Sequence, residues 1–209
     1  MSESNAPLGN LPIGKRNEMS QEMITEQEAK RQVALACRRL GLLHLAFSEV
    51  LVDQLGPEEG RRMAARAIKE YGRMIGEMKK ERALDEGLDL SPESFRMLSD
   101  LPSLGMHDRI EEVEVDGEKR IRAYGCVMGT VWAAQGKNEL GECYCLVDPA
   151  SSMAFNPDHK LVHTKRLPDG DPYCELAMRP STERDKEEFA DDDTDWNIIR
   201  GDPDERDHP

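Results

Sequence analysis

The residues of this chain best suited to covalent chemistry are two thiols, a carboxylate and an imidazole. They are Cys145, Asp148, His163 and Cys174, which together span 30 residues. A thiol attacks an sp² carbon once a base removes its proton, and an imidazole is a common base of this kind. We therefore predict a catalytic site in which Cys145 or Cys174 is the nucleophile and His163 is the general base and acid. Asp148 is expected to orient the imidazole or to hold a cationic group of the substrate.

The same residue types allow two other mechanisms. Water can be the nucleophile if a carboxylate, an imidazole or a metal ion activates it. Three thiolates and one imidazole would also suit zinc, and the alternative zinc ligands are Cys126, Cys145, Cys174 and His163. The C-x-C spacing that ends at Cys145 is only a weak metal signal, so we expect no cofactor, with zinc as the alternative. Buried cysteines can also serve simply as small apolar residues.

The elements that must position these side chains begin with two long helices. Apolar residues recur at helical spacing over residues 20–55, which predicts one helix, or two helices broken near Gly41. Pro57 then opens a second long helix that ends near Gly87. A short third helix is expected over residues 91–101. The two long helices are expected to pair as an antiparallel hairpin.

Two β-hairpins are expected after the helices. Asp116-Gly117 lies between alternating segments, which is a strong hairpin signal, and a Gly-containing turn at residues 168–172 indicates a second hairpin. Two further helices are expected between the hairpins. The expected fold class is α+β, an N-terminal helical hairpin followed by a ββααββ antiparallel-sheet unit. The segments of that unit are 110–124 for the first hairpin, 126–136 and 139–154 for the helices, and 159–166 and 173–178 for the second hairpin.

This arrangement of elements could bring the reactive side chains together. Cys145 and Asp148 are three residues apart on one expected helix, so they would share a face. His163 and Cys174 lie on paired strands and fall within a residue or two of facing each other. A helix packed on that hairpin would unite thiol, carboxylate and imidazole.

Composition and charge exclude some classes of function. The net charge of −14 argues against a nucleic-acid partner, which requires clustered Lys and Arg. The sequence has no apolar run long enough to span a membrane, and its first residues lack the features of a signal peptide. Five cysteines without an export signal are expected to be reduced thiols in a cytoplasmic protein.

The charge is concentrated in the C-terminal segment. Residues 181–209 hold twelve acidic and four basic residues, a net charge of −8. We expect a flexible N-terminus over residues 1–18, a single α+β domain over residues 19–180 and a disordered acidic tail over residues 181–209. The apolar stretch Trp196–Ile199 could dock on the body of the protein or on a second subunit, so a homo-oligomer is possible.

The motifs, taken in order, resemble the L-2-amino-thiazoline-4-carboxylic acid hydrolase family. The resemblance covers about residues 30–178, and its specificity comes from the order and spacing of the elements together. The long acidic tail is not part of the family pattern. The matching elements are Tyr71-Gly72 with Gly76, Cys126, Glu139-Leu140 with Glu142, Cys145-Leu-Val-Asp148, His163-Thr164, and Gly170 with Cys174-Glu175.

The resemblance implies a hydrolase that opens a thiazoline ring to an N-carbamoyl-cysteine. It adds Cys126 and Tyr71 to the expected substrate-binding residues. Glu175 is a substitute for Asp148, and Lys165 or Arg166 could pair with a substrate carboxylate. The expected function is therefore a hydrolase acting on a C–N or C–S bond of a small cyclic amidine. The alternative is a non-catalytic small-molecule or metal-binding module, or an accessory subunit, that uses the same pocket.

Overall fold

Two long antiparallel helices form the scaffold of the protein. The computed structural model describes residues 24–99 and 101–191. Helix α1 (Glu26–Leu55) begins at a Thr25 cap and is unbroken at Gly41, so the first of the two sequence alternatives is correct. Helix α2 (Pro57–Asp85) follows directly, with Pro57 in its first turn. Glu58 and Glu59 lie in its first turn, where the positive end of the helix dipole stabilises their negative charge. The short helix α3 (Pro92–Met97) is also present, and it begins at a Ser91 cap.

A four-stranded antiparallel sheet is formed by the two expected hairpins. Strands β1 (Arg109–Val115) and β2 (Glu118–Tyr124) form the first, and β3 (His159–Lys165) and β4 (Cys174–Pro180) form the second. Asp116 and Gly117 both have positive φ, at 52° and 81°, as a two-residue hairpin turn requires. A short 3₁₀ turn, Leu167–Asp169, lies in the second hairpin loop. The strand order is β1-β2-β4-β3, so β2 and β4 join the hairpins.

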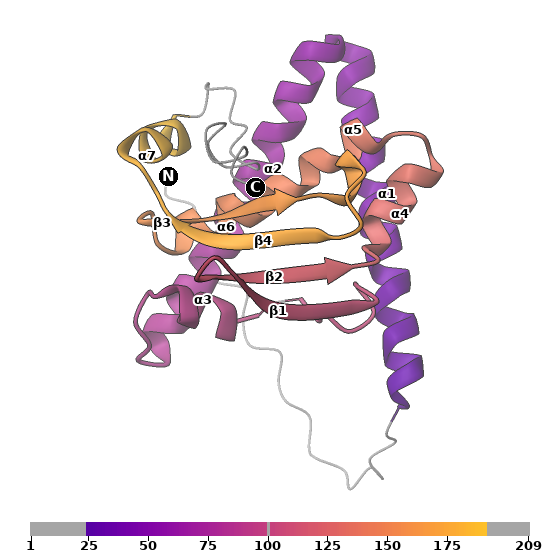
Figure 1. Cartoon of the computed structure of the whole chain (residues 1–209). Coiled ribbons are helices and arrows are strands. Elements are labelled where there is room, and N and C mark those ends of the chain that lie inside the picture. The colour runs from indigo at the N-terminus through magenta and orange to yellow at the C-terminus, as the bar shows by residue number, and fades with distance from the viewer. Residues whose placement is uncertain (1–23, 100, 192–209) are drawn as a thin grey trace, which may run out of the picture.

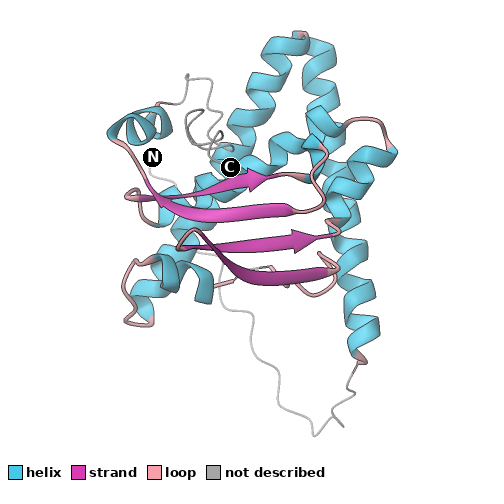
Figure 2. Ribbon diagram, viewed as in Figure 1, coloured by secondary structure: helices cyan, strands magenta, loops and turns pink. Residues whose placement is uncertain are grey.

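The chain between the hairpins is helical but more broken than expected. Helix α4 (Val127–Ala134) agrees with the first expected helix. The second is divided into α5 (Asn138–Gly141), a 3₁₀ segment, η1 (Glu142–Leu146), and α6 (Val147–Phe155). Pro149 has no N–H to donate to the carbonyl of Cys145, so a continuous α-helical ladder cannot cross this point. The helices lie together on one side of the sheet, as the α+β prediction required (Figures 1 and 2).

Helix α6 packs directly on α2, and two glycines allow the close approach. A Cβ atom on Gly72 would collide with the Cβ of Ala150, and one on Gly76 would collide with the backbone carbonyl of Ser151. Helix α6 is consequently almost completely buried between α2 and strand β3. The main apolar cluster lies among these helices and includes Leu45, Ile68, Met128, Val131, Trp132, Tyr144, Leu146, Ala150 and Met153.

Helix α7 (Glu183–Ala190) forms in the segment that the sequence analysis assigned to the acidic tail. Thr182 and Asp185 make a reciprocal capping box at its start. Asp185 also accepts a hydrogen bond from the buried Lys160 ammonium at 2.8 Å. The start of this segment is thus fixed to β3 by a tertiary ion pair. Residues 1–23 and 192–209, which include Trp196–Ile199, lie outside the described part of the chain. None of the described helices combines the length and the apolar character needed to cross a membrane.

Candidate functional site

An Asp–His pair joins α6 to the sheet. Nε2 of His163 on β3 lies 2.8 Å from Oδ2 of Asp148 in the first turn of α6. His163 is only 5% exposed, whereas the Asp148 side chain is 34% exposed and reaches the surface. Nδ1 of His163 is buried and has no hydrogen-bond partner in the described structure. One imidazole nitrogen is therefore held by a carboxylate, and the other is unpaired.

The docking of α6 against β3 sets the geometry of this pair. The Ser152 hydroxyl accepts a hydrogen bond from the backbone N–H of Leu161 at 2.8 Å. Ser152 is one helical turn from Asp148, and Leu161 is two residues from His163 on the same face of its strand. The serine contact thereby fixes the register of helix against strand at the position that brings carboxylate and imidazole together.

Three half-buried thiols lie within electrostatic reach of Asp148. Cys126 is the N-cap of α4, Cys145 lies in η1, and Cys174 begins β4. The Cys126 sulfur accepts a hydrogen bond from the Gly129 N–H, and the Cys174 sulfur accepts one from the Leu167 N–H, both at 3.4 Å. All three cysteines are free. Cys145 and Asp148 belong to two consecutive elements and not to one helix as expected.

Burial raises the pKa of each of these thiols. The effect is largest for Cys145, whose pKa lies well above the usual range. The pKa of Cys174 is raised to about 11. The Asp148 carboxylate raises the pKa of all three further, and the Arg166 guanidinium lowers those of Cys145 and Cys174. These mutual effects place the thiols in one electrostatic neighbourhood with Asp148, and they keep the thiols protonated at neutral pH.

Two further buried groups adjoin the site: His107, which the sequence analysis did not select, and Arg166, which it named as an alternative to Lys165. His107, just before β1, has a buried Nδ1 without a partner in the described structure. Burial lowers the pKa of His107, and the Asp148 carboxylate partly opposes that shift. Arg166, with a side chain only 3% exposed, pairs with Glu142 at 2.6 Å. Nothing in the local sequence marks His107, because it lies in an irregular loop and approaches Asp148 only in the folded chain.

A comparison with known protein families decides the family of this chain. A sequence model of L-2-amino-thiazoline-4-carboxylic acid hydrolase matches residues 38–178. The chain belongs to this family. The match begins in α1 and ends in β4, so it contains every residue of the site described above. No curated protein matches the chain. No solved structure matches it either.

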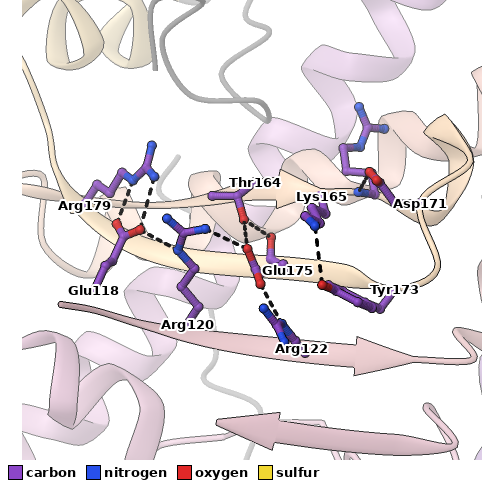
Figure 3. A network of polar contacts seen from close by, with 10 residues as sticks. Glu118, Arg120, Arg122, Thr164, Lys165, Asp171, Tyr173, Glu175 and Arg179 are labelled. Carbon is purple, nitrogen blue, oxygen red and sulfur yellow. Dashed lines mark hydrogen bonds and ion pairs between the residues drawn. The ribbon is translucent and has the colours of Figure 1, made fainter. Parts of the chain in front are cut away.

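Within the thiazoline hydrolase fold, Glu175 lies on the opposite face of the sheet from Cys174. Successive strand residues point to opposite faces, and Glu175 is directed away from the helices. It accepts hydrogen bonds from Arg120 at 2.8 Å, from Arg122 at 2.7 Å and from the Thr164 hydroxyl at 2.8 Å (Figure 3). Burial would raise the pKa of Glu175, but these three partners together lower it to about 2. The structure therefore does not bring Glu175 together with Asp148.

Lys165 belongs to the same polar face as Glu175. Its ammonium donates to the Tyr173 hydroxyl at 3.4 Å, and the Arg122 guanidinium lies over the Tyr173 ring (Figure 3). Lys165 is only two residues from His163, and equal alternation would place both on one face. The register of β3 against β4 shifts between these two residues. This bulge turns Lys165 away from the Asp148–His163 pair.

Tyr71 lies on the helical side of the sheet, where the family pattern placed a substrate contact. Its ring packs against Tyr144, with ring centroids 6.1 Å apart. Burial, followed by a hydrogen bond with Tyr71, raises the pKa of Tyr144, and the Asp148 charge adds to this shift. Tyr71 is therefore connected to the neighbourhood of Asp148 through the buried Tyr144.

No group of three or more His, Cys, Asp or Glu side chains within residues 24–99 and 101–191 has an arrangement that could hold a metal ion. The zinc site predicted as an alternative, with Cys126, Cys145, Cys174 and His163 as ligands, is not among such groups in the described residues and stays a prediction. His163 is instead engaged by Asp148.

Proposed function

We propose that this chain is a hydrolase that opens a small cyclic amidine of the thiazoline type, and that the Asp148–His163 pair performs the proton transfers. The observation that carries the proposal is the 2.8 Å contact between the two side chains, together with the unpaired Nδ1 of His163. Membership of the thiazoline hydrolase family supports the class of substrate.

The contact assigns a role to each imidazole nitrogen. When Nε2–H donates to the Asp148 carboxylate, Nδ1 carries the lone pair and is the basic atom. Asp148 holds this tautomer and stabilises the imidazolium that forms when Nδ1 takes a proton. The buried Nδ1 can then return the proton to the ring sulfur or nitrogen as the ring opens. One residue thus acts as base and acid in turn.

The nucleophile that Nδ1 activates is either a thiol or a water molecule. The raised pKa values of Cys145 and Cys174 mean that neither thiol is a thiolate at rest, so a thiol attack requires the base. The sulfur would bond to the sp² ring carbon as the ring C–S bond breaks, and water would then release the carbamoyl product. Direct attack by water gives the same overall reaction. One water molecule is consumed, and the product carries a free thiol and a urea group.

The charged groups near the pair suit the two ends of a thiazoline amino acid. Asp148 is a third exposed, and its carboxylate can contact a cationic amidinium group. Arg166 is a buried cation on the same side, with an Nε that has no partner in the described residues. In this proposal Arg166 holds the substrate carboxylate, a role that Lys165 is badly placed to fill because it contacts Tyr173 on the other face.

The test is turnover of L-2-amino-thiazoline-4-carboxylate by the purified protein, followed by the appearance of a free thiol in the product. The wild-type protein is expected to release it, and His163→Gln and Asp148→Asn are expected to lose about 10²-fold or more in kcat/KM. Cys143→Ser is the matched control, because Cys143 is on the same 3₁₀ segment as Cys145 but contacts the Glu139 carbonyl instead.

Cys145→Ala and Cys174→Ala separate the two nucleophiles. Loss of turnover in one of them identifies the attacking thiol, and full activity in both identifies water. Wild-type activity in His163→Gln would overturn the proposal. Binding of the substrate by the wild-type protein without turnover would support the non-catalytic binding module.

A further inference from the structure

Helix α1 presents a stripe of large apolar side chains to solvent. Leu43 is 55% exposed, Phe47 66% and Val50 60%. Leu35 and Leu42, also more than 40% exposed, continue the stripe towards the N-terminus. Leu42, Leu43, Phe47 and Val50 follow the helical repeat and form one apolar surface, and Leu35 lies on the same face beyond Arg38 and Arg39.

This stripe lies opposite the face by which α1 contacts the rest of the protein. The buried side of α1 is formed by Cys37, Gly41, His44 and Ser48, and it packs against α2, α4 and α5. Figure 1 shows α1 at one side of the molecule, with its N-terminal end extending past β1. No other helix or strand of the described chain covers the stripe.

The exposed apolar area of the stripe is large enough for it to be part of an interaction surface. Five half-exposed large side chains leave an apolar patch on the order of 500 Å², at the upper end for an ordinary monomer surface. A standard interface buries about 800 Å² on each partner. The polar residues that flank the stripe would supply the remainder, because α1 has 30 residues and is about 45 Å long.

The charges beside the stripe are divided between the two halves of the helix. Arg38 flanks its N-terminal half, Arg39 lies within that half between Leu35 and Leu43, and neither arginine has an ion-pair partner among the described residues. Glu49 and Asp53 flank its C-terminal half, where Glu49 contacts Lys137 at 3.2 Å through two exposed side chains. Two copies of α1 side by side in parallel would place like charges together. An antiparallel pair would place each arginine half against an acidic half.

We propose that the α1 stripe binds the same stripe of a second copy of this chain, with the two helices antiparallel about a two-fold axis. If the two-fold axis passes the helix at the level between positions 44 and 45, Leu43 lies level with Ala46 of the second copy, and Leu42 lies level with its Phe47. Large side chains then meet small or complementary ones, and Arg39 lies beside the acidic half of the opposite helix. The interface is isologous and closes at the dimer.

The mass of the full chain in solution, measured by light scattering, tests the proposal. The wild-type protein is expected to be a dimer and Phe47→Glu a monomer. Met78→Glu is the matched control, since Met78 is a 68% exposed apolar residue on α2 outside the stripe, and this variant should remain a dimer. A monomeric wild-type protein, including one whose stripe is covered by its own residues 196–199, overturns the proposal, as does a dimeric Phe47→Glu.

A charge exchange tests the antiparallel arrangement. Arg39→Glu is expected to raise the dimer dissociation constant, and Arg39→Glu combined with Asp53→Arg is expected to restore it. Equal melting temperatures at low protein concentration show that the substitutions leave the fold of the monomer intact. A combined variant that dimerises no better than Arg39→Glu alone overturns the antiparallel register.

Discussion

At the scale of single residues, the site depends on which groups are charged before substrate arrives. Asp148 supplies a negative charge at the surface end of the site, and it raises the pKa of every thiol around it. A nucleophilic thiolate is therefore unfavourable until a proton acceptor is available. In the proposed mechanism, the unpaired Nδ1 of His163 is such an acceptor.

The thiols should consequently be slow to react at neutral pH. With a pKa of about 11, Cys174 is almost fully protonated at pH 7, so its alkylation by iodoacetamide should be slower than in the denatured chain by about two orders of magnitude. The rate should rise as the pH approaches 11. Peptide mass spectrometry of alkylated samples measures it. Rapid alkylation of folded Cys174 at pH 7 would contradict the raised pKa.

Glu175 should make the stability of the fold dependent on acid pH. Its folded pKa of about 2 lies below the ordinary value of 4.5, so its carboxylate stabilises the folded state above pH 4.5. This contribution should be lost as the pH falls from 4.5 towards 2. Glu175→Ala, which leaves Arg120 and Arg122 without their shared partner, should cost about 3 kcal/mol at pH 7.

Urea unfolding of both proteins from pH 7 to pH 3 measures this dependence. The difference between wild type and Glu175→Ala should shrink as the pH falls. A constant difference across that range would show that the carboxylate charge is not what stabilises this face of the sheet.

At the scale of elements, the approach of α6 to α2 holds Asp148 in place. Gly76→Leu should force the helices apart, because even a Cβ atom at this position meets the Ser151 carbonyl. The expected loss is about 1–3 kcal/mol in the free energy of unfolding, with a loss of turnover because α6 carries Asp148. Glu77→Leu, at the exposed neighbouring position, is the control. Denaturant unfolding and the thiazoline assay provide the two readouts, and an unaffected Gly76→Leu would refute the close packing.

The sequence was sufficient to predict elements whose signals are local. Asp116-Gly117 determines the first hairpin, and Pro57 determines the start of α2. The break before α6 could have been anticipated from Pro149. Helix α7 has a local signal too, the Thr182 capping box, but its stability depends on the buried contact between Asp185 and Lys160, which only the folded chain reveals.

At the scale of the whole molecule, the pairing of β2 with β4 assembles the site. It places Cys174 directly beside Ala123 on β2, three residues before Cys126. This pairing joins strands that are far apart in the sequence, and no local sequence pattern in either hairpin predicts it. The same is true of the bulge that separates His163 from Lys165. The meeting of His163 with Asp148 followed from the predicted elements, whereas the assignment of Lys165 and Glu175 to a separate face required the tertiary structure.

A double-mutant cycle between Asp148 and His163, measured with L-2-amino-thiazoline-4-carboxylate, shows whether the two side chains act as a pair. If the carboxylate acts through the imidazole, Asp148→Asn combined with His163→Gln should have nearly the same kcat/KM as His163→Gln alone. Independent, multiplicative losses in the double variant would contradict a catalytic Asp148–His163 pair.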